Sequence, residues 1–234
     1  WVPAFVITLA FGAATGLINA FFVNGLKFVA FISTLAVSAV YGGLALVITN
    51  AQNIPIGNKS FISIGSINLL NTFPLPFVVM VILLVAYGVV LHFTGFGRRT
   101  YMVGGNASAA RLAGINPKKI TTILFVNNGV IASIAGLFFA SRMNMGSPSA
   151  ITGSDLDAVT AAVLGGIAFT GGAGNMFGVF IGIMLIISFQ NGIVVVGLDS
   201  YYQVVSKGLL LVAALMMDYF REKSRLKALK EERG

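Results

Sequence analysis

Side chains that commonly carry covalent or metal chemistry are scarce in this sequence. The chain contains no cysteine, and His92 is its only histidine. Without cysteine there can be no disulfide, thiolate nucleophile or thiolate-bound metal. His92 stands near the end of an apolar run, where a position at the membrane interface is a simpler interpretation than a proton relay. We therefore expect no catalytic residue, no metal site and no cofactor, and we predict that the chain is not an enzyme.

Two carboxylates, Asp155 and Asp157, stand two residues apart at the start of a glycine-rich apolar run. In the first turn of a helix, a carboxylate is favoured by the positive end of the helix dipole. Capping of a helix is therefore the simpler role for this pair. The alternative is a gate or contact at the outer mouth of a pathway, and Asp155 is the candidate for that role.

Among the polar residues inside apolar runs, four stand out as candidates: Ser33, Thr34, Asn127 and Asn128. An amide in hydrocarbon needs a hydrogen-bond partner, so the asparagines should bond another helix or face a wet cavity. A serine or threonine hydroxyl can simply bond a carbonyl of its own helix. Helix contact and pathway lining both stay open, and we take these four residues with Asp155 as candidate translocation-pathway residues.

Apolar helices must position these polar residues. The sequence is 57% hydrophobic and 9% charged, with a mean hydropathy of +0.92, whereas a soluble domain is about 25% charged. Uncharged stretches of about twenty residues can cross a hydrocarbon core of about 30 Å. The sequence predicts an all-α protein, a polytopic transmembrane helical bundle with about seven membrane segments. The runs are residues 1–23, 28–49, 77–93, 120–140, 156–170, 176–196 and 201–220.

The fifth apolar run and the polar segment 50–72 differ from the other parts of the chain. The fifth run is short enough to be a broken or re-entrant helix. Residues 50–72 are polar and turn-rich, which predicts a loop outside the hydrocarbon or buried in protein. Because the chain opens inside an apolar run without an initiator methionine, we interpret residues 1–234 as one transmembrane domain, the C-terminal part of a longer protein.

The formal net charge of +8 reflects basic residues placed beside the ends of the runs. That placement favours membrane orientation over nucleic-acid binding. Alternating the runs puts Lys59, Arg142 and Lys207 on one side and twelve basic residues on the other. The twelve are Lys27, Arg98, Arg99, Arg111, Lys118, Lys119, Arg221, Lys223, Arg225, Lys227, Lys230 and Arg233. The loop 97–119 and the tail 221–234 are therefore predicted to be cytoplasmic.

Within the loop 97–119, residues 107–113 form a short helix-favouring stretch with stop signals at both ends. Gly104 and Gly105 precede it, Asn106 is suited to be its N-cap, and Gly114 follows it. A stiff helix of small residues suits docking into a groove of another protein. The two glycines match no phosphate-binding loop, since the GxxxxGK[ST] pattern is lacking, so we expect no nucleotide site in this chain.

The amino-acid sequence of this loop is similar to a segment of a known family. Residues 97–115 read GRRTYMVGGNASAARLAGI, which resembles the GRxxYAxGGNxxAARLxGI segment of ribose-type ABC importer permeases. Residues 153–166 and 171–178 resemble the family's GxELDAIAAxxxGG and GGxGxxxG runs. Two departures are Met102 in place of the usual alanine and Asp155 in place of the usual glutamate. The similarity is strong from Phe96 onward and looser before it.

The resemblance implies a type II ABC importer-like permease, the transmembrane subunit of an ATP-driven importer for ribose or a similar monosaccharide. It implies a multi-pass protein of the bacterial cytoplasmic (inner) membrane, with ATP hydrolysis in separate ATP-binding ABC subunits. Further implied partners are a periplasmic or lipid-anchored sugar-binding protein, a second permease copy in a homo- or heterodimer, and membrane lipid, but no nucleic acid. The residues it assigns to ATPase coupling are Gly104, Gly105, Asn106, Ala109, Ala110, Arg111 and Gly114.

Other transporters remain as alternatives. ABC permeases for nucleosides or branched-chain amino acids share parts of this layout, and an ATP-independent channel or secondary transporter would belong to a different class. Co-purification with an ATPase subunit distinguishes the ABC permeases from the channel or secondary transporter.

Overall fold

The computed structural model describes residues 1–69 and 72–231, and its chain divides into two compact units. Unit 1 comprises Trp1–Leu83 and Ala113–Ile151, and unit 2 comprises Leu84–Leu112 and Thr152–Gly234. The last three residues of the tail that we expected at 221–234 lie outside the described residues. Within the described part of the chain, six helices are long and apolar enough to cross a membrane. The predicted polytopic helical bundle is confirmed.

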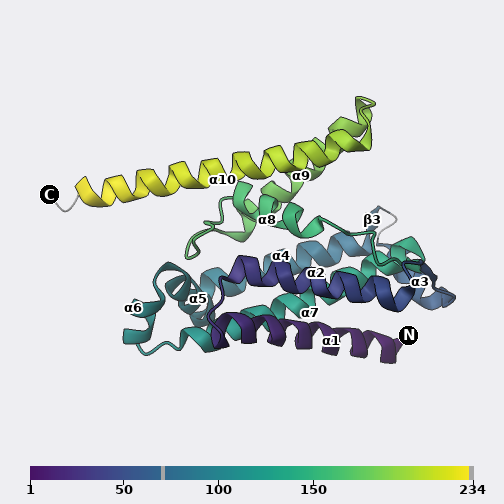
Figure 1. Cartoon of the computed structure of the whole chain (residues 1–234), viewed down its shortest axis with the longest axis horizontal. Coiled ribbons are helices and arrows are strands. Elements are labelled where there is room, and N and C mark those ends of the chain that lie inside the picture. The colour runs from purple at the N-terminus through teal and green to yellow at the C-terminus, as the bar shows by residue number, and fades with distance from the viewer. Residues whose placement is uncertain (70–71, 232–234) are drawn as a thin grey trace. The chain divides into compact units, whose positions relative to one another are not determined.

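The elements of unit 1 are mostly long helices (Figure 1). They are α1 (Val2–Ala20), the π-helical turn η1 (Phe21–Gly25), α2 (Ala30–Thr49), α3 (Lys59–Ser66), the first part of α4 (Leu75–Phe93) and α7 (Pro117–Met143). Four two-residue strands accompany these helices in the described part of the chain, which is otherwise mostly helical, as expected. Strand β1 (Ile54–Pro55) pairs antiparallel with β4 (Met145–Gly146), and β2 (Asn68–Leu69) pairs antiparallel with β3 (Phe73–Pro74).

Helices α1 and α7 lie antiparallel along unit 1 (Figure 1). A Cβ atom at Gly12 would overlap the Ser133 hydroxyl, and one at Gly16 would lie 2.6 Å from the Cα of Val126. Small residues spaced four apart allow such close backbone approach in membranes. At the end of η1, Asn24 Nδ2 donates to Thr122 Oγ1 at 2.9 Å and to the Lys118 carbonyl at 3.1 Å.

The polar segment after α2 is not only a loop, because it contains α3. Asn58 caps this helix by accepting a hydrogen bond from the Phe61 amide at 3.1 Å. Ser141 of α7 is fully buried, accepts from the Gly65 amide at 2.7 Å and donates to the Phe61 carbonyl at 2.7 Å. The turn-forming residues hid the helix in the sequence, and long-range hydrogen bonds to α7 stabilise it.

The elements of unit 2 are the rest of α4, α5 (Gly95–Gly105), α6 (Ala107–Leu112), α8 (Ser154–Leu164), α9 (Met176–Val195) and α10 (Ser200–Glu231). Residues 97–105, which the sequence suggested were loop, are helical. Thr94 Oγ1 accepts from the Gly97 amide at 3.3 Å and caps α5. The helix has a glycine at position 97 because a Cβ there would overlap the backbone of Leu91.

The fifth apolar run is confirmed as a short segment. Helix α8 has 11 residues, which span about 16 Å, or roughly half of a hydrocarbon core. Residues 165–175, here called the glycine turn, follow it without helical structure and contain four glycines with positive φ: Gly166, Gly171, Gly172 and Gly174. Glycine is the residue that adopts this backbone conformation without steric strain.

The helix directions in unit 2 show where the broken segment goes. Asp157, near the start of α8, pairs with Lys207, near the start of α10, and the Phe169 amide of the glycine turn donates to Asp218, further along α10. Helix α8 with the glycine turn therefore runs parallel to α10. Helix α9 runs back along α8, since Gly178 packs on Gly165 and Gly182 on Ala161. The broken segment thus runs in the same direction as α10, from the level of Lys207 to that of Asp218.

Candidate functional site

Helix α6 is a short, capped and exposed helix between α5 and α7. Asn106 Oδ1 accepts from the Ala109 amide at 2.9 Å, which satisfies a free donor in the first turn. The helix ends at Leu112, and Gly114 has φ +77, a left-handed backbone that stops helix propagation. At the start of α7, Asn116 Oδ1 accepts from the Lys119 amide at 3.2 Å. Side-chain caps thus fix the N-terminal end of α6 at Asn106 and the N-terminal end of α7 at Asn116.

The side chains of α6 divide into an inward and an outward set. Ala110 is 3% exposed and anchors the helix on its own chain, whereas Ala109 and Arg111 are exposed. Leu112 is 92% exposed. The sequence placed Leu112 inside the loop motif but gave it no role. An apolar side chain this exposed, on a short helix beside basic residues, is a surface feature suited to contact with another protein.

Gly104 and Gly105 are the last two residues of α5 rather than part of a loop. A Cβ at Gly104 would lie 2.5 Å from the Gly172 amide nitrogen, so the two backbones are in direct contact. One turn earlier on α5, Tyr101 Oη donates to the Gly174 carbonyl at 2.8 Å. The helix that leads into α6 is therefore fastened to the glycine turn at two points.

Asp218 fastens the same turn to α10. Its Oδ2 accepts from the Phe169 amide at 3.2 Å, and a Cβ at Gly166 would lie 3.5 Å from the guanidinium of Arg221. Within the turn, the Ala168 amide donates to the Ala173 carbonyl at 3.1 Å, and the Gly171 amide donates to the Ala168 carbonyl at 2.9 Å. Sequence reasoning missed Asp218 and Tyr101. A carboxylate inside the last apolar run was the available signal for Asp218.

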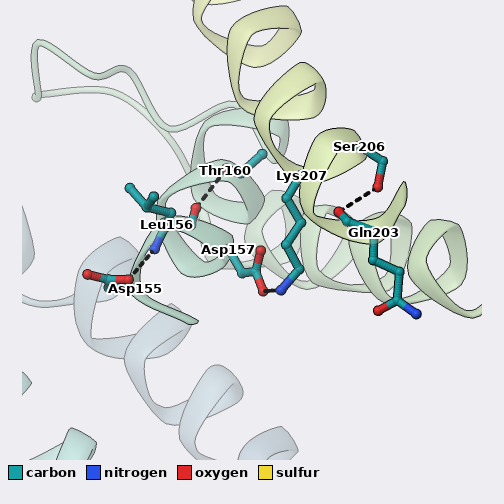
Figure 2. A network of polar contacts seen from close by, with 7 residues as sticks. All are labelled: Asp155, Leu156, Asp157, Thr160, Gln203, Ser206 and Lys207. Carbon is teal, nitrogen blue, oxygen red and sulfur yellow. Dashed lines mark hydrogen bonds and ion pairs between the residues drawn. The ribbon is translucent and has the colours of Figure 1, made fainter. Parts of the chain in front are cut away.

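The ion pair between Asp157 and Lys207 lies near the starts of α8 and α10 (Figure 2). Lys207 Nζ and Asp157 Oδ2 are 2.6 Å apart, and both side chains are partly exposed. Asp155 is exposed, and its Oδ1 accepts from the amide of Leu156 at 3.0 Å, inside the first turn of α8. The two carboxylates thus have different partners, one local and one on another helix.

The structure places the other candidate pathway residues in unit 1, on α2 and α7. Ser33 is buried on α2 and lines an apolar pocket of about 280 Å³ formed by residues of α1, η1 and the first half of α2, together with Phe28. Thr34 Oγ1 donates to the Ala30 carbonyl at 3.0 Å, so its hydroxyl bonds its own helix. Asn127 is half-buried, and Asn128 is exposed. The structure therefore does not bring the five candidates together in one unit.

The family "Branched-chain amino acid transport system / permease component" matches residues 1–215. The chain belongs to this permease family. It is 36% identical over 208 residues to the L-arabinose transport system permease protein AraH of Escherichia coli (strain K12), covering 89% of this chain and 63% of that protein. It is 38% identical over 200 residues to the ribose import permease protein RbsC of Bacillus subtilis (strain 168), covering 85% of this chain and 61% of that protein.

The ribose import permease protein RbsC of Escherichia coli (strain K12) is 35% identical over 218 residues, covering 92% of this chain and 68% of that protein. The chain thus spans about three fifths to two thirds of the permeases it matches. No solved structure gives a significant match. The resemblance to sugar permeases seen in residues 97–178 is confirmed. The six apolar helices of the described residues agree with a multi-pass membrane member of this permease family.

Proposed function

We propose that this chain is the membrane-spanning part of a permease subunit in an ATP-driven importer. It would move ribose or a similar simple sugar across the bacterial cytoplasmic membrane. The observation that carries the proposal is α6, a capped helix with an outward Leu112, fastened through α5 to the glycine turn of a broken span. A separate ATP-binding subunit docks on α6 and supplies the energy.

The proposed coupling surface has a sharper definition than the sequence allowed. Its outward members are Ala109, Arg111 and Leu112, with Asn106 as the cap that fixes the helix. Ala110 faces its own chain, so its small size serves the packing of α6 rather than contact with the ATPase. Gly104, Gly105 and Gly114 act through the backbone at the ends of α5 and α6.

Transport in this proposal is alternating access. A sugar-binding protein, periplasmic or anchored by lipid, delivers the substrate on the outer side, and a second permease copy completes the pathway. Closure of the ATPases displaces the docked helices and biases the permease between its inward-open and outward-open states. Among the candidate pathway residues we assign this role to Asn128 of α7 and Asp155 of α8, because both are polar residues with exposed side chains.

Docking is tested by Leu112→Asp in the full-length permease expressed with its ATPase. We expect co-purification of the ATPase and sugar uptake to fall at least tenfold, because a charge replaces the exposed apolar contact. Leu198→Asp is the control, since Leu198 is an exposed leucine in the turn after α9. Normal co-purification by the Leu112 variant would count against docking at α6, and a permease that recruits no ATPase would favour a channel or secondary transporter.

The substrate class is tested on the cognate binding protein. Its thermal stabilisation is measured with pentoses, hexoses, nucleosides and branched-chain amino acids, because a ligand that binds only the folded state raises the melting temperature. We expect a response to one or more monosaccharides, in line with the arabinose and ribose permeases that the chain is similar to. Stabilisation by nucleosides alone, or by branched-chain amino acids alone, would replace the sugar assignment.

A further inference from the structure

The glycine turn joins three helices through contacts that are short and specific. It contacts α5 through Tyr101 and Gly104, contacts α10 through Asp218, and continues directly into α9. Asn175, its last residue, caps α9 by accepting a hydrogen bond from the Gly178 amide at 2.6 Å. A displacement of α5 therefore cannot occur without either moving this turn or breaking these contacts.

The contact with α5 is of a kind that transmits movement. Gly104 and Gly172 meet backbone to backbone, with no side chain between them that could change rotamer and absorb a shift. The hydrogen bonds between residues 168, 171 and 173 stiffen the turn itself. The Tyr101 hydroxyl adds a directional bond to the Gly174 carbonyl at 2.8 Å. Close-packed contacts without slack pass displacement on instead of damping it.

We propose that Tyr101 and Gly104 form the link through which movement of α6 reaches the broken span of α8 and the glycine turn. Tyr101 is a positioning residue, since its hydroxyl holds the glycine turn to α5. This inference rests on the proposed function, because it needs an ATPase acting on α6. It adds that the glycine turn is the first element of the transport pathway to respond.

The decisive variant is Tyr101→Phe in the full-length permease, reconstituted with its ATPase and loaded binding protein. The substitution removes one hydroxyl and keeps the ring. We expect co-purification with the ATPase and basal ATP hydrolysis to be unchanged. Sugar transported per ATP hydrolysed should fall about fivefold or more, a size that loss of one hydrogen bond supports. Tyr219→Phe is the matched control, because Tyr219 is a tyrosine of α10 with 63% exposure.

A second pair of variants tests the backbone contact independently. Gly104→Ala places a methyl group 2.5 Å from the Gly172 nitrogen and must separate α5 from the turn, whereas Gly95→Ala at the start of α5 meets only the end of the Arg98 side chain at 3.9 Å. We expect Gly104→Ala to lower transport per ATP more than Tyr101→Phe does, with the ATPase still bound. Gly95→Ala should transport like the unmodified permease.

Three results would overturn the inference. Wild-type transport per ATP in Tyr101→Phe would show that the hydroxyl transmits nothing, and wild-type transport in Gly104→Ala would show the same for the backbone contact. Loss of ATPase binding by Tyr101→Phe would show that the residue serves docking instead of transmission. Failure of the proposed function is a separate result, since the unmodified permease would then recruit no ATPase at all.

Discussion

Different groups hold the contact between α1 and α7 in unit 1 and the contact between α8 and α10 in unit 2. In unit 1, α1 meets α7 through Gly12 and Gly16 along continuous helices, and Ser141 ties α3 to α7 from a fully buried position. In unit 2, the broken α8 is tied to α10 by the ion pair between Asp157 and Lys207 and by Asp218 at the glycine turn. Continuous backbone packing resists movement along its whole length, whereas a few discrete polar contacts can be made or broken singly. We therefore infer a structural role for the contact between α1 and α7, and we expect the contact between α8 and α10 to be the one that changes during transport.

The largest expected effect comes from breaking the α1 and α7 contact. Gly12→Val places a branched side chain where even a Cβ overlaps Ser133 and Gly129, so the helices must separate. Overpacking costs about 1–3 kcal/mol and occasionally more, and we expect a loss at or above the upper end because the overlap includes backbone. Folded yield and thermal unfolding in detergent measure the effect. Gly42→Val on α2 is the control, because nothing lies within 4 Å of a Cβ at that position. Equal stability of the two variants would remove the structural role of the contact.

A smaller loss is expected from Ser141→Ala. The substitution leaves the Gly65 amide and the Phe61 carbonyl without their long-range partner, and an unsatisfied buried group costs about 1–3 kcal/mol. The free energy of unfolding should fall by that amount, with α3 becoming the first part of unit 1 to be cleaved in limited proteolysis. Ser63→Ala is the control, since its hydroxyl bonds the Ser60 carbonyl within α3. If the Ser141 variant were as stable as the control, the hydrogen bonds between Ser141 and α3 would not stabilise unit 1.

The smallest effect on stability is expected at the ion pair of unit 2. Lys207→Gln, Asp157→Asn and the double variant form a cycle that isolates the interaction between the two charges. Because both side chains are partly exposed, the coupling free energy should be at most ~1 kcal/mol. Sugar uptake should change more than stability does, if this region moves during transport. A coupling free energy as large as the stability loss of Ser141→Ala, with sugar uptake unchanged, would give this ion pair a structural role like that of Ser141.

Much of the fold could be predicted because the membrane imposes length and apolarity on every span. Six of the expected runs correspond to helices long enough to cross, and the short fifth run corresponds to α8. The helices α3 and α5 were not predicted, since glycine, asparagine and serine in their sequences indicate turns as strongly as caps. Gly97 is helical here because its lack of a side chain admits the Leu91 backbone, a contact that no local pattern reports.

The candidate site divides in a similar way. The short α6 helix and its Asn106 cap follow from local sequence, because capping needs only residues three positions apart. Local sequence does not reveal that Ala110 faces inward while Leu112 is 92% exposed. Tyr101 and Gly174 are 73 positions apart, and their hydrogen bond exists only because α5 and the glycine turn fold against each other.

The amino-acid sequence by itself determined the class of protein, the approximate spans and the family motif in the loop 97–119, because composition and short motifs are local properties. The tertiary structure alone decided what each polar group bonds. It pairs Asp157 with Lys207, and it forms the hydrogen bonds between Asp218 and the glycine turn and between Tyr101 and Gly174. Such pairings join residues about 50 to 70 positions apart, and only the packing of whole helices brings those residues within hydrogen-bond distance.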